Sequence, residues 1–398
     1  MRTLVLFTRD LRVHDHPALS AAADAGEVLP LFVLDPGLSR RSPNRSSFLA
    51  RSVHDLQAAL SSRGAPLVIR RGDPGAVAVA LAQRHRCDTI HVTSDVTNVA
   101  ARRLDVLRSS GLSVRPFPGN DVVAPGAITP TGEDAYRIFT PYLRAWLKTS
   151  PRRPASTPRR IHPVNGVAAG RLPVAGRPTA RTLPTGGEPA GRRAMHAFVR
   201  HGLDRYEDDR DRLDRNATSR LSAYLRFGCI SPLELAALAS ERGGAAFVRQ
   251  LAWRDFFRQL VAADPRRTRE DLRPGRAPRW RRDPEGFDRW TGGTTGVDVV
   301  DAAMHQLLDE GWMPNRARLV AASYLTRTLE IDWRLGAAHF DRHLVDGDPA
   351  SNIGNWQWVA GTGANPRRGA AMNPDRQAAR FDPLGSYRTR YLGERNAR

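Results

Sequence analysis

Short apolar runs alternate with longer helical stretches through the first 148 residues, and the alternation ends there. The runs cover residues 4–7, 28–34, 67–69, 89–92 and 112–117. Each run has the length of a strand, and segments rich in Ala, Leu and Arg separate them. Strands that alternate with helices form parallel sheets covered on both faces. The pattern therefore predicts an α/β N-terminal domain, Rossmann-like, with a five-stranded parallel sheet.

The rest of the chain is expected to be a linker followed by helices. Residues 149–191 are rich in Pro, Gly, Arg, Ser and Thr and show no apolar period. Apolar residues then recur at helical spacing in segments 232–242, 245–263, 297–310 and 316–330. Ser231, Pro232 and Glu234 match a helix start in which the glutamate reaches back to the cap. We predict an α/β domain at 1–148, a linker at 149–191 and an all-helical domain at 192–398.

The charge of the chain is strongly positive, at a formal +20, and Lys148 is the only lysine. Such a charge suits a polyanionic partner, because guanidinium groups bind phosphate with two parallel hydrogen bonds. It also suits an arginine-rich composition with no such partner. Cys87 and Cys229 are too few for a disulfide framework, and no apolar run has membrane-spanning length. These features predict a soluble cytoplasmic protein.

Residues 346–358 combine acidic and aromatic side chains that neither a plain core nor a solvated loop would hold together. Asp346 and Asp348 lie one residue apart, Asn352 follows, and Trp356 and Trp358 are again one residue apart. Burying an unpaired carboxylate is costly, and an exposed indole leaves a large apolar area in water. Polar groups beside stacking surfaces suit a pocket for a flat, polar aromatic molecule.

This segment resembles the flavin-pocket signature of the DNA photolyase/cryptochrome family, and other motifs occur in that family's order. They are Thr8-Arg-Asp-Leu-Arg, Thr218-Ser-Arg-Leu-Ser, Trp253-Arg-Asp-Phe-Phe, Val300-Asp-Ala-Ala-Met, Trp312-Met-Pro-Asn-Arg and Ile331-Asp-Trp. The resemblance runs from the first strand to Asn373, nearly the whole chain. It implies that the helical domain binds FAD and that the protein acts on DNA.

The resemblance assigns FAD contacts mainly to the helical half. The segment 218–222 would hold the FAD phosphates, although by itself it would be an ordinary helix cap. Arg318 and Asp346 would form an ion pair beside the flavin ring, and Asn352 would face its N5 atom. The full implied set is Tyr206, Thr218, Ser219, Arg220, Leu221, Ser222, Arg254, Asn315, Arg318, Asp346, Gly347, Asp348 and Asn352.

The resemblance also implies catalytic and DNA-binding residues. Trp280, Trp333 and Trp356 match a chain of electron carriers from flavin to surface, and Asn352 is the fourth catalytic residue. Without the resemblance, three scattered tryptophans would be core residues. The residues implied to bind DNA or its lesion are Arg210, Gln250, Trp253, Asn315, Arg316 and Trp358.

Several positions depart from the family pattern. Val99 stands where some members have a folate-contacting glutamate, and the cysteine–lysine pair used with it is absent after Asp271. A deazaflavin antenna, or none, is therefore favoured over folate. Residues 365–371 replace the family's Pro-Tyr-Phe-Arg stretch and have no assigned role. His339 and His343 have i,i+4 spacing but lack the glutamate of a zinc-protease helix, so no metal is expected.

The activity that the resemblance implies is light-driven splitting of cyclobutane pyrimidine dimers flipped out of UV-damaged DNA, by a monomeric FAD-dependent lyase. Gln250 leaves (6-4) photoproducts open, because (6-4) enzymes also have glutamine there. Those enzymes have two histidines where this chain has Asn315 and Leu319, and neither of these titrates near neutrality. A cryptochrome-like photoreceptor without repair activity is the other alternative.

Overall fold

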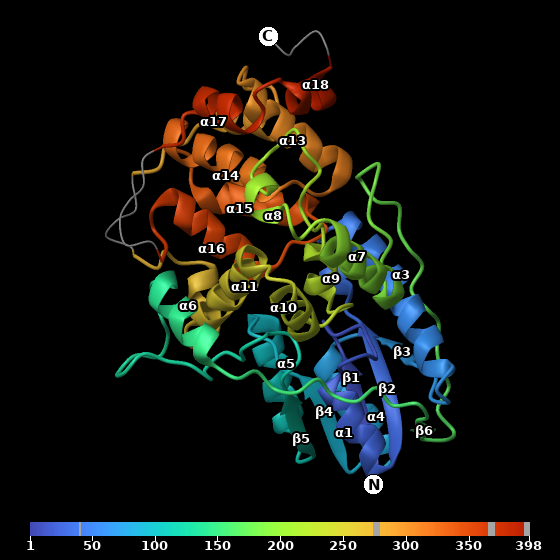
Figure 1. Ribbon diagram of the computed structural model, residues 1–398. Coiled ribbons are helices and arrows are strands. Elements are labelled where there is room, and N and C mark those ends of the chain that lie inside the picture. The colour runs from blue at the N-terminus through green and yellow to red at the C-terminus, as the bar shows by residue number, and fades with distance from the viewer. Residues whose placement is uncertain (40, 274–278, 365–370, 394–398) are drawn as a thin grey trace.

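The protein has a sheet domain at one end and a helical assembly at the other, as Figure 1 shows. The structure is a computed structural model that describes every residue except 40, 274–278, 365–370 and 394–398. The segment 365–370, which departs from the family pattern, thus lies outside the described residues. The N-terminus is in the sheet domain, and the last described helix, Ser386–Leu392, lies at the far side of the helical assembly.

The sheet has the five predicted parallel strands, in the order β3-β2-β1-β4-β5. Their bounds are β1 Arg2–Phe7, β2 Glu27–Leu34, β3 Val68–Arg71, β4 Thr89–Thr93 and β5 Ser113–Phe117. A sixth strand, β6 (His162–Pro163), comes from the linker and pairs with β2 beside the end of β3. Two residues carry no periodic signal, so the sequence could not predict it.

Helices cover both faces of the sheet because alternate strand residues face opposite sides. On β1, Val5 and Phe7 belong to the cluster that includes α1 and α3, whereas Leu4 and Leu6 pack with α4 and α5. These helices are α1 Pro17–Ala25, α3 Pro43–Ser61, α4 Pro74–Arg84 and α5 Asn98–Arg108, and the short α2 spans Pro36–Ser39. The predicted α/β domain with both faces covered is confirmed.

The remaining elements are helical, as predicted. They are α6 Phe139–Lys148, α7 Glu188–His201, α8 Tyr206–Asp209, α9 Ser222–Phe227, α10 Pro232–Glu241, α11 Ala245–Ala263, α12 Pro284–Gly292, α13 Asp298–Glu310, α14 Asn315–Ser323, α15 Trp333–His343, α16 Pro349–Ala360, α17 Pro374–Phe381 and α18 Ser386–Leu392. A 3-10 turn spans Pro265–Thr268. The helix α7 begins inside the segment expected to be linker.

Two local expectations differ from the structure. Ser231 caps α10 by accepting from the Glu234 amide (3.2 Å), but the Glu234 carboxylate pairs with Arg192 (2.6 Å) instead of reaching back. The helix expected at 316–330 ends as α-helix at Ser323 and continues as a π-helical turn, Tyr324–Thr328. Such π-helical turns are rare, but many of those known lie near functional sites. The spacing of apolar residues alone does not reveal them.

The two domains share a hydrophobic core. One buried cluster extends from Val5 and Phe32 of the sheet to Phe247 and Phe256 of α11. The crossing is tight at the end of α9, where the Leu11 amide donates to the Phe227 carbonyl (3.1 Å). Across the described residues, no helix combines the length and the apolarity needed to cross a membrane.

Gly228 marks the closest approach of the two domains and provides a test of this contact. Its φ is +65°, and an added Cβ would lie 2.1 Å from the Arg9 carbonyl oxygen. Gly111 has a φ of +76°, but a Cβ there would meet no atom within 4 Å. We expect Gly111→Ala to lower the free energy of unfolding by about 1 kcal/mol, which is the backbone cost alone.

Gly228→Ala should lower the free energy of unfolding by roughly 2 kcal/mol more than Gly111→Ala does, because backbone atoms of the other domain must also move. Chemical denaturation of both variants measures the difference. Equal losses in the two variants would show that the α9 end does not need this close approach.

Candidate functional site

The helix α16 carries three of the implied site residues, and its N-terminus fixes where they point. Asp348 caps the helix, with Oδ1 accepting from the Ser351 amide (3.0 Å). Asn352 and Trp356 lie four residues apart on one face, and Trp358 leaves the helix in another direction. Trp356 is 2% exposed and Trp358 is half-buried. The helix therefore separates the two indoles, as the sequence predicted.

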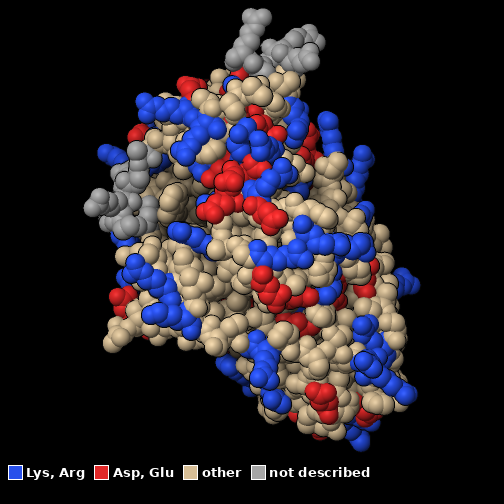
Figure 2. Space-filling model, in the orientation of Figure 1, with Lys and Arg blue, Asp and Glu red and all other residues tan. Residues whose placement is uncertain are grey.

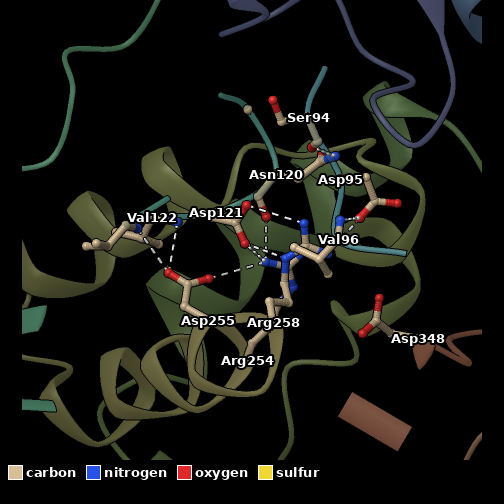
Figure 3. Close-up of polar contacts among 12 residues, drawn as sticks. Ser94, Asp95, Val96, Asn120, Asp121, Val122, Arg254, Asp255, Arg258 and Asp348 are labelled. Atoms are coloured by element: carbon tan, nitrogen blue, oxygen red, sulfur yellow. Dashed lines mark hydrogen bonds and ion pairs between the residues drawn. The ribbon is translucent and has the colours of Figure 1, made fainter. Parts of the chain in front are cut away.

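The α/β domain holds this helix end through Arg9, in the loop after β1. Arg9 Nη2 donates to the second Asp348 oxygen, and its Nη1 lies 3.1 Å from Asp95. Arg258 of α11 bonds both Asp95 (3.1 Å) and Asp121, and Figure 3 shows its side chain among these loops. Burial raises the pKa of Asp348, but Arg9 and Arg258 outweigh this effect and hold it well below its usual value. Asp348 is thus ionised and paired.

Asp346 forms the ion pair expected from the sequence. Its Oδ2 accepts from Arg318 Nη2 (2.8 Å), and Arg318 also donates to the Met313 carbonyl (2.9 Å). Asp346 is 6% exposed, and its Oδ1 is buried with no hydrogen-bond partner among the described residues. A buried carboxylate oxygen without a donor is costly. The site therefore fits a ligand with an N–H group, which a flavin ring supplies.

Asn352 is oriented by the neighbouring helix α15. Its Nδ2 donates to the Ala337 carbonyl (3.0 Å), and its backbone amide donates to the Asp348 carbonyl (2.8 Å). One of the two Nδ2 hydrogens is engaged in this way, so Asn352 can offer a ligand its side-chain oxygen and the other N–H. This orientation follows from the capped start of α16.

The segment implied to bind phosphate lies at the start of α9, beside Trp312. Ser222 Oγ accepts from Trp312 Nε1 (3.3 Å), and Ser219 Oγ accepts from the Leu221 amide (3.4 Å). Arg220 has a φ of 51°, pairs with Glu310 (2.9 Å) and lies 4.2 Å above the Trp312 ring. Its guanidinium is thus engaged in packing, whereas Thr218 and Ser219 are half-buried hydroxyls.

Tyr206 is separate from that segment in the chain and sits on α8. Its ring packs edge-on against Phe247 (5.2 Å) and Phe198 (5.7 Å). Burial raises the pKa of Tyr206 to about 12, so its hydroxyl stays protonated and can donate a hydrogen bond. The helices α8 and α16 both pack against α11.

Of the three implied electron carriers, Trp333 and Trp356 are buried and Trp280 is partly buried against the same hydrophobic cluster. Trp356 packs against Gly336, one turn after Trp333 on α15; a Cβ on Gly336 would lie 2.3 Å from the Trp356 ring. Trp333 Nε1 donates to Asp271 (2.7 Å).

Sequence reasoning missed Trp290, whose ring centre lies 6.1 Å from that of Trp356 and which is fully buried. Its position on α12 gave no motif, so only the spacing of apolar residues on that helix could have placed it in the core. His339 also packs on Trp290 (5.6 Å) and lies 4.6 Å from His343.

The residues implied to bind DNA come from α8, α11, α14 and α16. Asn315 is exposed, and Arg210, Gln250 and Trp358 are half-buried. Arg316 is already engaged: it pairs with Asp211 (3.1 Å) and lies 4.2 Å above the Phe381 ring.

One ring face of Trp253 is covered, because Phe139 stacks on it at 3.6 Å and 8°. On the face of the molecule that Figure 2 shows, basic side chains are spread out and acidic side chains gather near the position of α8. That helix carries Glu207, Asp208 and Asp209. On this face of the molecule, the basic side chains therefore do not form a continuous surface.

Arg254 faces the α/β domain. Its Nη1 donates to the Asn120 carbonyl (2.6 Å) and lies 3.5 Å from Asp255 (Figure 3). Arg226, which sequence reasoning missed, donates to the Gly347 carbonyl (2.8 Å) and so supports the loop before α16. Arg9, Arg226 and Arg258 were missed as supports because each acts on residues far away in the chain.

Comparison with known proteins identifies the family. The family model for the FAD binding domain of DNA photolyase matches residues 247–397, and the DNA photolyase model matches residues 3–160. The chain is 45% identical to the deoxyribodipyrimidine photo-lyase of Streptomyces griseus, over 96% of this chain and 88% of that protein. The chain belongs to the DNA photolyase family. Residues 247–397 accordingly belong to an FAD-binding domain.

Other photolyase family members are similar along nearly the whole chain. A deoxyribodipyrimidine photo-lyase of Thermus thermophilus is 34% identical over 98% of this chain and 92% of its own length. A bacterial class III photolyase structure from Agrobacterium tumefaciens superposes with a TM-score of 0.91 at 31% identity, covering 98% and 86% of the two chains. A Synechocystis cryptochrome structure gives 0.90 at 28% identity, covering 99% and 89%.

The cross-domain pair of Arg9 and Asp348 generates a prediction. Arg9→Met removes the guanidinium that bonds Asp348 and leaves Asp95 with Arg258 alone, so the free energy of unfolding should fall by roughly 3–5 kcal/mol. Asp348→Asn keeps the helix cap, because asparagine caps as well as aspartate, and leaves Arg9 paired with Asp95. The free energy of unfolding should therefore fall less in Asp348→Asn than in Arg9→Met.

The double variant should be more stable than the sum of the two losses predicts, with a coupling of about 1–3 kcal/mol. Urea denaturation measures the coupling, and the absorbance of co-purified FAD reports whether α16 keeps its position. Additive losses with full FAD content would show that this pair does not support the helix.

Proposed function

We propose that this chain is a light-dependent deoxyribodipyrimidine photo-lyase that splits cyclobutane pyrimidine dimers in DNA with FAD. The observation that carries the proposal is the buried Asp346, paired on one oxygen with Arg318 and open on the other, beside the capped start of α16. Support comes also from relatives bearing that enzyme name, 34–45% identical over nearly the full chain.

The protein groups in this proposal bind and orient. When bound and reduced, FAD supplies the electron that light transfers to the dimer. Asp346 Oδ1 accepts from the flavin ring, Asn352 offers its side-chain oxygen near N5, and Thr218, Ser219 and Ser222 hold the phosphates. Tyr206 donates from its protonated hydroxyl. The buried side chains around α16 exclude water from the site.

We assign DNA recognition to the end of α8 and to residues of α11, α14 and α16. Arg210 and Arg316 bind phosphates that flank the lesion, together with Asn315. Trp253 and Trp358 offer apolar ring surface to the flipped-out dimer, and Gln250 offers hydrogen bonds. Because Phe139 covers one face of Trp253, the ring contacts the dimer through its other face or its edge.

The choice of lesion rests on residues that titrate. Proton transfer to a (6-4) photoproduct needs a group that ionises near neutrality. Asn315 on α14 and Leu319, one turn later, cannot supply it, and this favours cyclobutane dimers despite Gln250. A cryptochrome-like photoreceptor remains the alternative from another class, with the Synechocystis neighbour as its support.

Finer features belong to the same proposal. Val99, half-buried at the start of α5, favours a deazaflavin antenna, or none, over folate. A structural neighbour from Sulfolobus tokodaii is described with two FAD molecules, so a second chromophore has precedent. We propose that the protein works as a cytoplasmic monomer and joins the nucleoid during repair.

Lesion specificity is the direct test. The reduced, FAD-loaded protein is illuminated with oligonucleotides that carry either a cyclobutane dimer or a (6-4) photoproduct, and restored bases are measured by chromatography. We expect restoration of the cyclobutane lesion and none of the (6-4) lesion. Repair of the (6-4) lesion alone would overturn the substrate assignment, and repair of neither would favour a photoreceptor.

The tryptophan path is tested separately from repair. Replacing Trp280, the outermost of the three proposed carriers, with Phe should slow the light-driven reduction of oxidised FAD by an external reductant. Repair by chemically reduced protein should be unchanged, because that step does not use the path. A Trp290→Phe variant provides a buried tryptophan control. Unchanged photoreduction in Trp280→Phe would remove this residue from the path.

A further inference from the structure

A cavity of about 1020 Å³ opens where the α/β domain, the linker and the helical domain meet. Its walls come from the loop after β1, the end of α3, Thr157 of the linker, the exposed side of α7 and the end of α10. None of the residues assigned above to FAD or DNA lines it. Pockets of this size at domain junctions are common small-molecule sites.

The cavity is strongly basic. Arg63, Arg192, Arg193, Arg200 and Arg242 line it, with Glu188 as the acidic residue among the lining. Glu188 is buried, and its two oxygens accept from the Val13 and His14 amides (2.8 and 3.0 Å). It is thus committed to holding the β1 loop.

Three of these arginines keep charge available for a ligand. Arg192 is neutralised by Glu234 (2.6 Å). Arg63 bonds only neutral oxygens, those of Ala59 (2.7 Å), Pro158 (3.1 Å) and Ser62 (3.4 Å). Arg200 donates to a carbonyl of its own helix, and Arg242 is exposed at the end of α10. Arg193, the fifth arginine, lies close enough to Asp55 to act on its carboxylate electrostatically. In the described part of the chain, no carboxylate lies within 4.0 Å of Arg63, Arg200 or Arg242.

The rest of the lining is mostly aliphatic and contains no Phe, Tyr or Trp, and its other polar members are His14, Thr157 and His196. Val13, Ala59, Val199 and Leu238 provide aliphatic surface between the arginines. Sites for single-stranded nucleic acid combine basic grooves with aromatic platforms for bases. A concave, aliphatic cavity with clustered guanidinium groups instead suits a compact molecule that carries phosphate at one end.

We propose that this cavity binds a phosphate-bearing organic anion of nucleotide size, with Arg63 and Arg242 on its phosphates and the aliphatic wall against its remaining part. Such a ligand would contact both domains and the linker at once. Its binding energy would therefore add to the stability of the arrangement in which Arg9 reaches Asp348.

The test uses the FAD-loaded protein, so that the FAD site cannot take up the probe. Binding of the fluorescent nucleotide mant-ADP is followed by fluorescence anisotropy, with ADP, pyrophosphate, adenosine and an undamaged DNA duplex as competitors. We expect ADP and pyrophosphate to displace the probe and adenosine to fail, because phosphate is the recognised group.

Arg63→Ala and Arg242→Ala should each weaken mant-ADP binding roughly tenfold, the size of one lost charge-assisted hydrogen bond. Arg51→Ala, an exposed arginine on α3 and outside the cavity, is the matched control and should bind as the unaltered protein does. Arg242 is exposed at a helix end, so its loss should leave the fold intact and keep the test valid if Arg63→Ala is unstable.

Two outcomes would overturn the proposal. One is the absence of mant-ADP binding, or equal binding by the cavity variants and Arg51→Ala. The other is displacement of the probe by the duplex at concentrations where ADP fails, because the cavity would then be part of a nucleic-acid surface. Either outcome would overturn the proposed ligand site and leave the proposed repair function standing, because the lesion-repair assay tests that function separately.

Discussion

The contact between Arg9 and Asp348 is the interaction on which the functional half of the molecule depends. It joins a loop of the sheet domain to the residue that caps α16, and α16 carries Asn352 and Trp356. The ions are buried, and buried ions are stable only when paired and fully hydrogen-bonded. Asp95 and Arg258 complete that pairing. The helix that presents the site is thus positioned by charges that cannot move independently of the sheet.

The topology of the sheet explains why these charges meet. Arg9 follows β1, Asp95 follows β4 and Asp121 comes shortly after β5, and these strands are neighbours in the order β1-β4-β5. Parallel neighbours end at the same edge, which in open α/β sheets is the usual place for a ligand. In this protein, Arg254 and Arg258 of α11 occupy much of that edge. The polar groups at these strand ends therefore bind the helical domain. In other open α/β sheets, polar groups at this edge are available to a cofactor.

The sequence predicted what depends on neighbours in the chain or on a family motif. Apolar runs indicated the strands, Ser231 marked the start of α10, and the motif indicated the Arg318–Asp346 pair. It could not predict β6 or the π-helical turn at Tyr324, which lack a periodic signal. It also missed Arg9 as a partner of Asp348, because nothing in either segment specifies a contact across 339 residues of chain. The sequence also missed the stacking of Phe139 on Trp253, because these two residues lie far apart in the chain as well.

The formal charge of +20 is a poor guide to the charge available for a partner. Arg9, Arg254 and Arg258 are paired inside the domain interface. Arg316, on the side assigned to DNA, is already paired with Asp211, so a phosphate can bind it only by displacing or sharing that carboxylate. Such competition lowers affinity for any duplex and leaves more of the selectivity to contacts with the lesion itself. An arginine-rich composition therefore supplies internal structure first, and DNA affinity only where the fold leaves guanidinium groups unpaired.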